Sequence, residues 1–143
     1  MATPTTEQLN GAVRGFDRLY GLQLLSYSDT EVLAQVKVRE ELKQPMGLIH
    51  GGVYAAIAES ITSLVTAIAV LEQGNVATGQ SNATSFLRPI TEGAIHARAT
   101  RLHRGRTTWV WDVSFYDDQE RLCAITRMTI AVRPLPAGSP QGA

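Results

Sequence analysis

Apolar and polar residues alternate in two stretches of the chain, residues 31–38 and 107–116. Successive side chains of an extended strand point to opposite faces, so a period of two is typical of a strand with one buried face. Both stretches are therefore predicted to be half-buried strands. The residues expected on the buried faces are Val32, Ala34, Val36 and Val38 in the first stretch, and Trp109, Trp111, Val113 and Phe115 in the second.

The rest of the second half of the chain has the same character, and turn-forming residues divide it. Segments 77–88 and 94–102 are separated by a turn at 91–93, and a hairpin turn at 117–120 precedes a strand over 121–132. We therefore expect about four strands in a meander in this half, with two further strands in the first third of the chain.

Two other segments carry helical patterns. In the first, residues 6–20, Leu9, Val13, Phe16 and Leu19 recur at near-helical spacing. This spacing predicts a short amphipathic helix before the first strand.

The second helical segment, residues 51–71, is apolar on every side and follows a loop at 42–47 that contains Pro45 and Gly47. It is about long enough to cross a bilayer. Against a membrane span, it contains the charged Glu59 and several hydroxyl residues, and no positively charged flank adjoins it. A soluble helix without a polar stripe is usually buried, so we expect a central helix wrapped by a curved antiparallel sheet.

These elements fit one α+β domain over residues 1–133, with an N-terminal helical segment at 1–20. A chain of 143 residues has the usual size of a single domain with its own core. Residues 134–143 are rich in Pro, Gly and Ala and are expected to form a flexible tail.

Composition and charge exclude several function classes. Lys plus Arg and Asp plus Glu are both 13, so the formal net charge is zero and nothing favours a nucleic-acid partner. One cysteine, Cys123, and three histidines show no metal-ligand spacing, so no metal or cofactor is expected. The single cysteine and an N-terminus without a signal-peptide pattern favour a cytoplasmic protein without membrane attachment.

Glu59 is the only charged residue between Gly51 and Leu71, and it is the strongest candidate for chemistry. An ionised carboxylate in apolar surroundings is strongly disfavoured unless it is paired. A functional role therefore explains a buried Glu59 best. A glutamate whose turn of the helix reaches solvent would need no such explanation.

Gly51 and Gly52 lie in the first turn of the same helix, where backbone N–H groups lack partners within the helix. A helix N-terminus favours negative charge, and glycine allows close approach. The helix tip is thus suited to polarise a carbonyl or to hold an anionic tetrahedral intermediate. The alternative is that the two glycines only permit tight packing.

The spacing of these candidates has a consequence for assembly. Gly51 and Glu59 are eight residues apart, which is about 12 Å along one helix, too far for both to contact one reacting carbonyl. If they cooperate, they come from two chains. Two such helices, antiparallel across a twofold axis, would give a homodimer with two equivalent shared sites.

Three longer stretches, QPMGLIHGGVYAAIAESITS, NATSFLRPITEG and HRGRTTWVWDVSFYDDQERLCA, resemble one family. Over about residues 20–133 the chain is similar to the hotdog-fold acyl-CoA thioesterases. The similarity is to their glutamate-dependent, PaaI-like branch, which contains 4-hydroxybenzoyl-CoA and 1,4-dihydroxy-2-naphthoyl-CoA thioesterases. The resemblance implies a long helix wrapped by five to six antiparallel strands and hydrolysis of an acyl-CoA, with aromatic acyl groups favoured. It also implies a homodimer as the minimal unit, and homotetramers are common in the family.

The resemblance implies a role for each matching residue. Glu59 would attack the thioester carbonyl or activate the hydrolytic water, and both possibilities remain open. The Gly51 amide would polarise the thioester oxygen from the partner subunit's helix, and Gln44 would orient the substrate carbonyl or the nucleophile. His50 would support the site through a hydrogen bond, with a capping or packing role as the alternative.

Three further positions concern the carboxylate and coenzyme A. Ser63 follows Glu59 by one helical turn, so its hydroxyl is placed to bond the carboxylate or a water. The resemblance points to Arg88, Arg106 and Thr107 as contacts of the nucleotide portion. For any single arginine, a place in a solvated hairpin end is an equally good interpretation.

Two other functions remain open on this sequence. A hotdog hydratase or dehydratase would need a catalytic histidine paired with an acidic residue on the central helix, and here no histidine follows His50 in that helix. A non-catalytic acyl-CoA-binding module would keep the cleft and dispense with the carboxylate. The presence of Glu59 therefore counts against a binding module.

Overall fold

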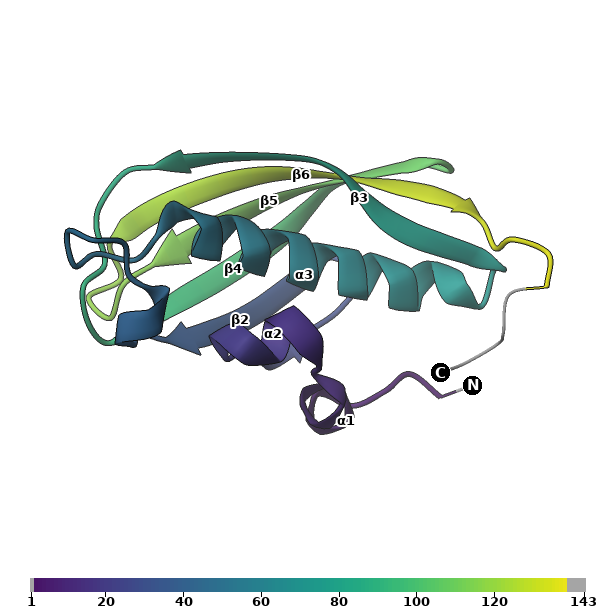
Figure 1. The fold of residues 1–143 in the computed structure, drawn as a ribbon. Coiled ribbons are helices and arrows are strands. Elements are labelled where there is room, and N and C mark those ends of the chain that lie inside the picture. Colours follow the sequence, from purple (N-terminus) through teal and green to yellow (C-terminus); the bar gives the residue numbers. More distant parts are fainter. Residues whose placement is uncertain (1, 139–143) are drawn as a thin grey trace.

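The computed structural model describes residues 2–138 of the chain and consists of helices packed on a single sheet (Figure 1). The helical elements are α1 (Thr6–Ala12), α2 (Gly15–Tyr20), the short 3₁₀ helix η1 (Glu40–Leu42) and α3 (Gly51–Leu71). The strands are β1 (Gln23–Tyr27), β2 (Glu31–Lys37), β3 (Asn75–Phe86), β4 (Ala94–Arg104), β5 (Thr108–Tyr116) and β6 (Leu122–Pro134).

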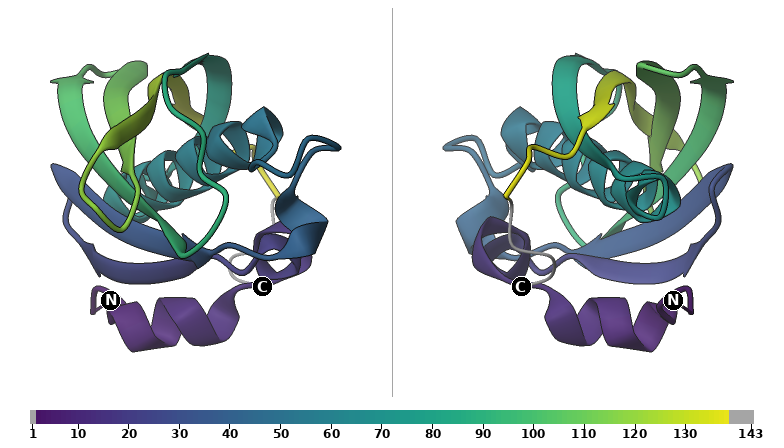
Figure 2. Two further views of the ribbon diagram at one scale, coloured as in Figure 1. Left: turned by 90° about the vertical axis from the view of Figure 1, so that its left-hand side faces the viewer. Right: turned by 90° about the vertical axis from the view of Figure 1, so that its right-hand side faces the viewer.

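The six strands form one antiparallel sheet that curves around α3 (Figure 2). Their spatial order is β1-β2-β4-β5-β6-β3. The expected helix inside a curved sheet of five to six strands is therefore confirmed. The expected four-strand meander is wrong at one strand, because β3 pairs with β6 and not with β4. β3 is consequently an edge strand beside α3.

The alternating segments form strands with the expected buried faces, except that Val38 follows the end of β2 and is only partly buried. β2 buries Val32, Ala34 and Val36, and β5 buries every second residue from Trp109 to Phe115. These side chains form one buried cluster with residues of α3.

Helix α3 begins and ends where the sequence predicts, at Gly51 and Leu71. Its length and hydropathy also suit a membrane span, but one side of it packs against the sheet. The side chains buried on that side include Ile57, Ile61 and Val65. The helix is not buried around its whole circumference, because the sheet ends at β3 and leaves one side open.

The N-terminal segment forms two helices where one was predicted. The helical path breaks after Ala12, and Gly15 has a φ of +57°, which favours glycine. α1 packs on β1 and α2 on α3. Of the expected apolar face, Leu9 packs on the core, whereas Phe16 and Leu19 remain 64% and 68% exposed.

The chain reverses between β5 and β6 at the hairpin turn predicted over residues 117–120. The Asp117 carboxylate stabilises the turn, because it accepts hydrogen bonds from the backbone N–H groups of Gln119 and Arg121, both at 3.0 Å. At the other end, β6 continues to Pro134. The flexible tail expected over 134–143 thus begins inside a strand, and its last part, 139–143, lies outside the described residues.

Candidate active site

The N-terminal tip of α3 carries an open backbone donor. His50 is the N-cap residue, and its Nδ1 accepts a hydrogen bond of 2.8 Å from the N–H of Gly52. The capping role for His50 is therefore observed. The N–H of Gly51 has no acceptor among the described residues. One N–H group is left at the positive end of a helix of 21 residues.

Gly51 has a steric reason to be glycine. The ring of Phe86, at the end of β3, lies over it, and a Cβ atom on Gly51 would be 2.6 Å from Phe86 Cζ. Close packing and an open N–H group thus occur at the same residue. The two interpretations of this glycine are compatible.

A cleft of about 450 Å³ opens beside this tip. Its lining brings together Gln44, Gly51 and Arg88, three of the residues singled out in the sequence. Tyr54 and Phe86 form an aromatic wall, with ring centroids 6.1 Å apart. Burial raises the pKa of Tyr54 to about 12, so this phenol remains protonated and does not act as a base near neutral pH.

Glu59 lies on α3 two turns after the tip, and its position corrects one expectation. In the single chain the side chain is exposed, not enclosed by apolar neighbours. It faces the edge strand, since a Cβ atom added to Gly79 would be 3.4 Å from Glu59 Cγ. The carboxylate forms no hydrogen bond or ion pair with the described residues. Beyond β3 no further strand of the same chain covers this side of the helix.

Ser63, one turn further along α3, does not form the expected hydrogen bond to Glu59. Its Oγ is buried and has no partner among the described residues. The carboxylate and the hydroxyl are thus both unpaired on the same face of the helix.

The residues expected to contact coenzyme A are far apart within one chain. The N–H of Arg88 bonds the carbonyl of Cys123 near the start of β6, whereas the carbonyl of Thr107 accepts from Val132 near its end. These points are about 30 Å apart along an extended strand. Arg106 lies with Thr107 in the β4–β5 turn.

Neighbouring arginines of that hairpin have structural partners. Arg98 pairs with Glu31, and Arg101 and Arg104 both pair with Asp29. In the part of the chain that the structure describes, Arg106 has no ion pair. These three arginines thus have structural ion pairs, and Arg101 is not solvated, since its side chain is only 16% exposed.

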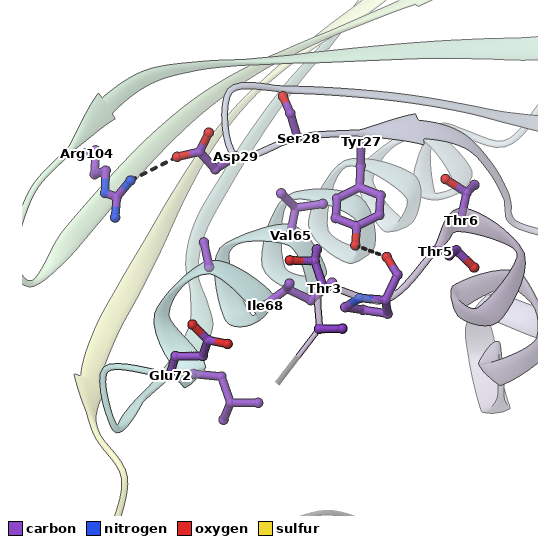
Figure 3. A pocket seen from close by; sticks show the side chains of 14 residues that line it. Thr3, Thr5, Thr6, Tyr27, Ser28, Asp29, Val65, Ile68, Glu72 and Arg104 are labelled. Carbon is purple, nitrogen blue, oxygen red and sulfur yellow. Dashed lines mark hydrogen bonds and ion pairs between the residues drawn. The ribbon is translucent and has the colours of Figure 1, made fainter.

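A larger cavity, about 970 Å³, lies elsewhere (Figure 3). It is bounded by the N-terminal segment, by Tyr27 and by the C-terminal half of α3, including Val65 and Ile68. Ile68 follows Glu59 by nine residues, which places the two on opposite sides of an α-helix with 3.6 residues per turn. This cavity is therefore separate from the candidate site.

One of the three histidines and the single cysteine have structural contacts outside the candidate site. His96 lies 2.7 Å from Asp118, and Cys123 is buried with its thiol 3.2 Å from the carbonyl of Arg121. Among residues 2–138 no group of three or more His, Cys, Asp or Glu side chains converges as a metal site.

Sequence reasoning missed the contacts that join α3 to β3. Phe86 and Gly79 were not singled out, although they lie against Gly51 and Glu59. No local pattern signals such contacts, because they depend on β3 folding back along the helix as an edge strand.

Comparison with known proteins identifies the family. Residues 46–124 match the family described as the Thioesterase superfamily. The chain belongs to this superfamily. A thioesterase of Haemophilus influenzae has a TM-score of 0.88 with 31% identity, and 97% of each chain is covered. A mutant thioesterase of Pseudomonas aeruginosa has a TM-score of 0.88 with 32% identity over 94% of this chain and 97% of that one.

A relative with a named substrate also belongs to this group. The 1,4-dihydroxy-2-naphthoyl-CoA hydrolase of Listeria monocytogenes is 31% identical over 119 residues, which cover 83% of this chain and 96% of the relative. The matches confirm the hotdog fold and the membership in a family of thioester hydrolases. In a member of the thioesterase superfamily, the open Gly51 amide and the unpaired Glu59 are the first candidates for groups that act on a thioester.

Proposed function

We propose that this protein hydrolyses acyl-CoA thioesters to a free acid and coenzyme A. The observation that carries the proposal is the open N–H of Gly51 at the tip of α3, in a cleft shared with Gln44 and Arg88. A preorganised N–H donor of this kind stabilises the negative charge that develops on a carbonyl oxygen during acyl transfer. Arg88 at the cleft offers a positive charge to a phosphate of the substrate.

The chemistry needs one further group, and we assign it to Glu59. As general base, its carboxylate takes a proton from water while the water oxygen attacks the thioester carbon. The tetrahedral oxyanion then collapses, the C–S bond breaks, and the coenzyme A thiolate leaves and takes up a proton. As nucleophile, the carboxylate attacks the carbon itself, the C–S bond breaks and the coenzyme A thiolate leaves and takes up a proton. Water then hydrolyses the resulting mixed anhydride to the free acid and the Glu59 carboxylate. Both routes consume one water and need the same carbonyl polarisation.

We further propose that two chains share each site. Gly51 and Glu59 are about 12 Å apart along one helix, so Gly51 would serve a carbonyl attacked from Glu59 of the second copy. With Gly51 opposite Glu59, a twofold axis passes near Ala55, midway between them. The exposed edge of β3 supports antiparallel pairing of two β3 strands, and the exposed Glu59 would then be covered.

The same pairing accounts for the separated arginines. Antiparallel chains bring the β4–β5 turn of one copy to the end of the sheet at which Arg88 of the other lies. Arg106 and Thr107 of one chain and Arg88 of its partner would thus serve one coenzyme A. The homotetramer remains an expectation from the family resemblance.

The acyl group is proposed to be aromatic. Tyr54 and Phe86 line the cleft with aromatic rings, which favour stacked or edge-on contacts with an aryl group. The Listeria relative that is named for a naphthoyl-CoA substrate supports the same class.

A thiol-release assay with a panel of aryl- and alkyl-CoA esters tests the reaction. We expect coenzyme A release, fastest for aryl esters. Glu59→Ala is expected to lower kcat by at least about 10²-fold, as is typical of removing a main acid–base group, with the dimer intact. Glu7→Ala, at an exposed glutamate of α1, is the matched control with unchanged kcat.

Three results would contradict the proposal. Binding of CoA esters without thiol release would favour the binding module. Hydration of an enoyl-CoA without thiol release would favour the hydratase. A Glu59→Ala variant with wild-type kcat would remove Glu59 from the mechanism.

A further inference from the structure

An irregularity in β3 arranges the surface that faces α3. The register with β6 shifts between Gly79 and Ser81, so one extra residue, Gln80, enters β3 at this point. Because side chains alternate along a strand, the extra residue lets Gly79 and Asn82 face the same side. Both residues contact α3, Gly79 beside Glu59 and Asn82 at Ala55.

The Asn82 side chain bonds the helix one turn before Glu59. Its Nδ2 donates to the carbonyl oxygen of Ala55 at 2.9 Å. In an α-helix this carbonyl is also the acceptor for the N–H of the residue four positions later, which is Glu59. Asn82 therefore shares the acceptor that fixes the backbone of the candidate catalytic residue.

Two threonines orient the Asn82 amide. The hydroxyl of Thr84 donates to Asn82 Oδ1 at 2.9 Å, and Thr84 and Thr126 hydroxyls are 2.9 Å apart. Since the Thr84 proton is used toward Asn82, Thr126 is the donor to Thr84. The chain of bonds runs from β6 through β3 to α3 and leaves the Asn82 NH₂ group directed at Ala55.

We propose that Asn82 is a positioning residue for thioester hydrolysis. It sets the distance between β3 and the α3 turn that lies midway between Gly51 and Glu59. This inference rests on the proposed function, in which a twofold axis passes near Ala55. Asn82 then lies at the same axis, so one contact in each chain sets the spacing of both shared sites.

The exposure of Asn82 separates this role from a stabilising one. Its hydrogen bond to Ala55 is exposed in the single chain, and the Ala55 carbonyl keeps the N–H of Glu59 as a donor when Asn82 is replaced, so the loss of this bond has little effect on folding. A displacement of about 1 Å between catalytic groups, by contrast, can lower the rate by up to about 10²-fold. Loss of rate without loss of stability is the expected signature.

The first test compares Asn82→Ala with Asn75→Ala, which removes an asparagine of the same strand that has no side-chain hydrogen bond to described residues. We expect Asn82→Ala to lower kcat between about 10- and 100-fold, with KM, dimer formation and thermal midpoint unchanged. Thr84→Val should reproduce part of the loss. Amide hydrogen exchange at Glu59 should accelerate in Asn82→Ala and not in Asn75→Ala.

A second variant supplies a pH signature. In Asn82→Asp an ionised carboxylate would face the Ala55 carbonyl and repel it, whereas the protonated carboxyl could donate as the amide does. The ratio of kcat for Asn82→Asp to kcat for Asn82→Ala should therefore rise as the pH falls from about 6 to 4, toward the ordinary pKa of an aspartate. A merely structural asparagine would give a ratio independent of pH.

The proposal is overturned if Asn82→Ala keeps wild-type kcat. It is also overturned if the fall in kcat is explained by a lower thermal midpoint or by a smaller fraction of dimer. Unchanged exchange at Glu59 would also overturn it. If the wild-type protein releases no thiol, the proposed function fails, and the exchange measurement still decides whether Asn82 restrains the Glu59 turn.

Discussion

At the residue scale, Gly51 has no side chain and also has an available N–H group. Substitutions can test the contributions of these two properties separately. Proline is well tolerated at the first position of a helix and has no N–H. His50 has φ −63° and ψ 133°, a conformation compatible with a following proline. Gly51→Pro therefore removes the donor, while Gly51→Ala keeps it.

Both substitutions add a Cβ atom where the Phe86 ring lies, so they share this part of the steric cost, and proline also replaces the N–H hydrogen by its Cδ atom. We expect Gly51→Pro to have a kcat about 10²-fold below that of Gly51→Ala, the loss typical of one oxyanion donor. The thiol-release assay measures the difference. Equal kcat values for the two variants would show that the N–H of Gly51 takes no part in the reaction.

Some residue properties were accessible from the sequence, and others were not. The isolation of Glu59 in an apolar helix and the glycines at the tip mark both as candidates without any structure. The exposure of Glu59 was not predictable, because it depends on the position of the sheet edge. The open hydroxyl of Ser63 likewise depends on packing beyond its own helix.

At the element scale, the side chain of Asn10 hydrogen-bonds α1 to the sheet, in addition to the packing of Leu9 on the core. Asn10 Nδ2 donates to the carbonyl of Leu24, and Asn10 Oδ1 accepts from the N–H of Leu24, both at 2.8 Å. The amide thus pairs with β1 at the free edge of the sheet, as a neighbouring strand would.

Asn10→Ala is expected to lower the free energy of unfolding by about 1 to 3 kcal/mol, because it leaves two part-buried backbone groups unpaired. Urea unfolding followed by circular dichroism measures the change. kcat should remain at the wild-type value, since α1 is remote from the Gly51 cleft. Asn75→Ala is the control, and an equal effect in both variants would contradict this role of Asn10.

The elements themselves could largely be predicted, and their arrangement could not. The period of two gave β2 and β5 with the correct buried faces, and apolar continuity gave α3 from Gly51 to Leu71. The pairing of β3 with β6 is set by the return of the chain along α3, which no local pattern reports. The break before Gly15 depends on a positive φ that a helical spacing of apolar residues does not reveal.

At the scale of the whole molecule, one chain presents two incomplete half-sites. Among the described residues, the cleft at the tip of α3 is lined by Gly51 and by no carboxylate, whereas the Glu59 face has a carboxylate but no helix N-terminus. An antiparallel pair of chains would complete both sites at once. The central claim is therefore that activity belongs to the pair and not to the single chain.

Complementation between two inactive variants tests most directly whether activity belongs to the pair of chains. Glu59→Ala and Gly51→Pro are mixed in equal amounts, unfolded together and refolded, and the thiol-release rate is compared with each parent. Half of the randomly formed dimers are mixed, and each has one site with both groups intact, so we predict about a quarter of the wild-type activity. Activity no higher than the mean of the two parents, with mixed dimers present, would contradict a shared site.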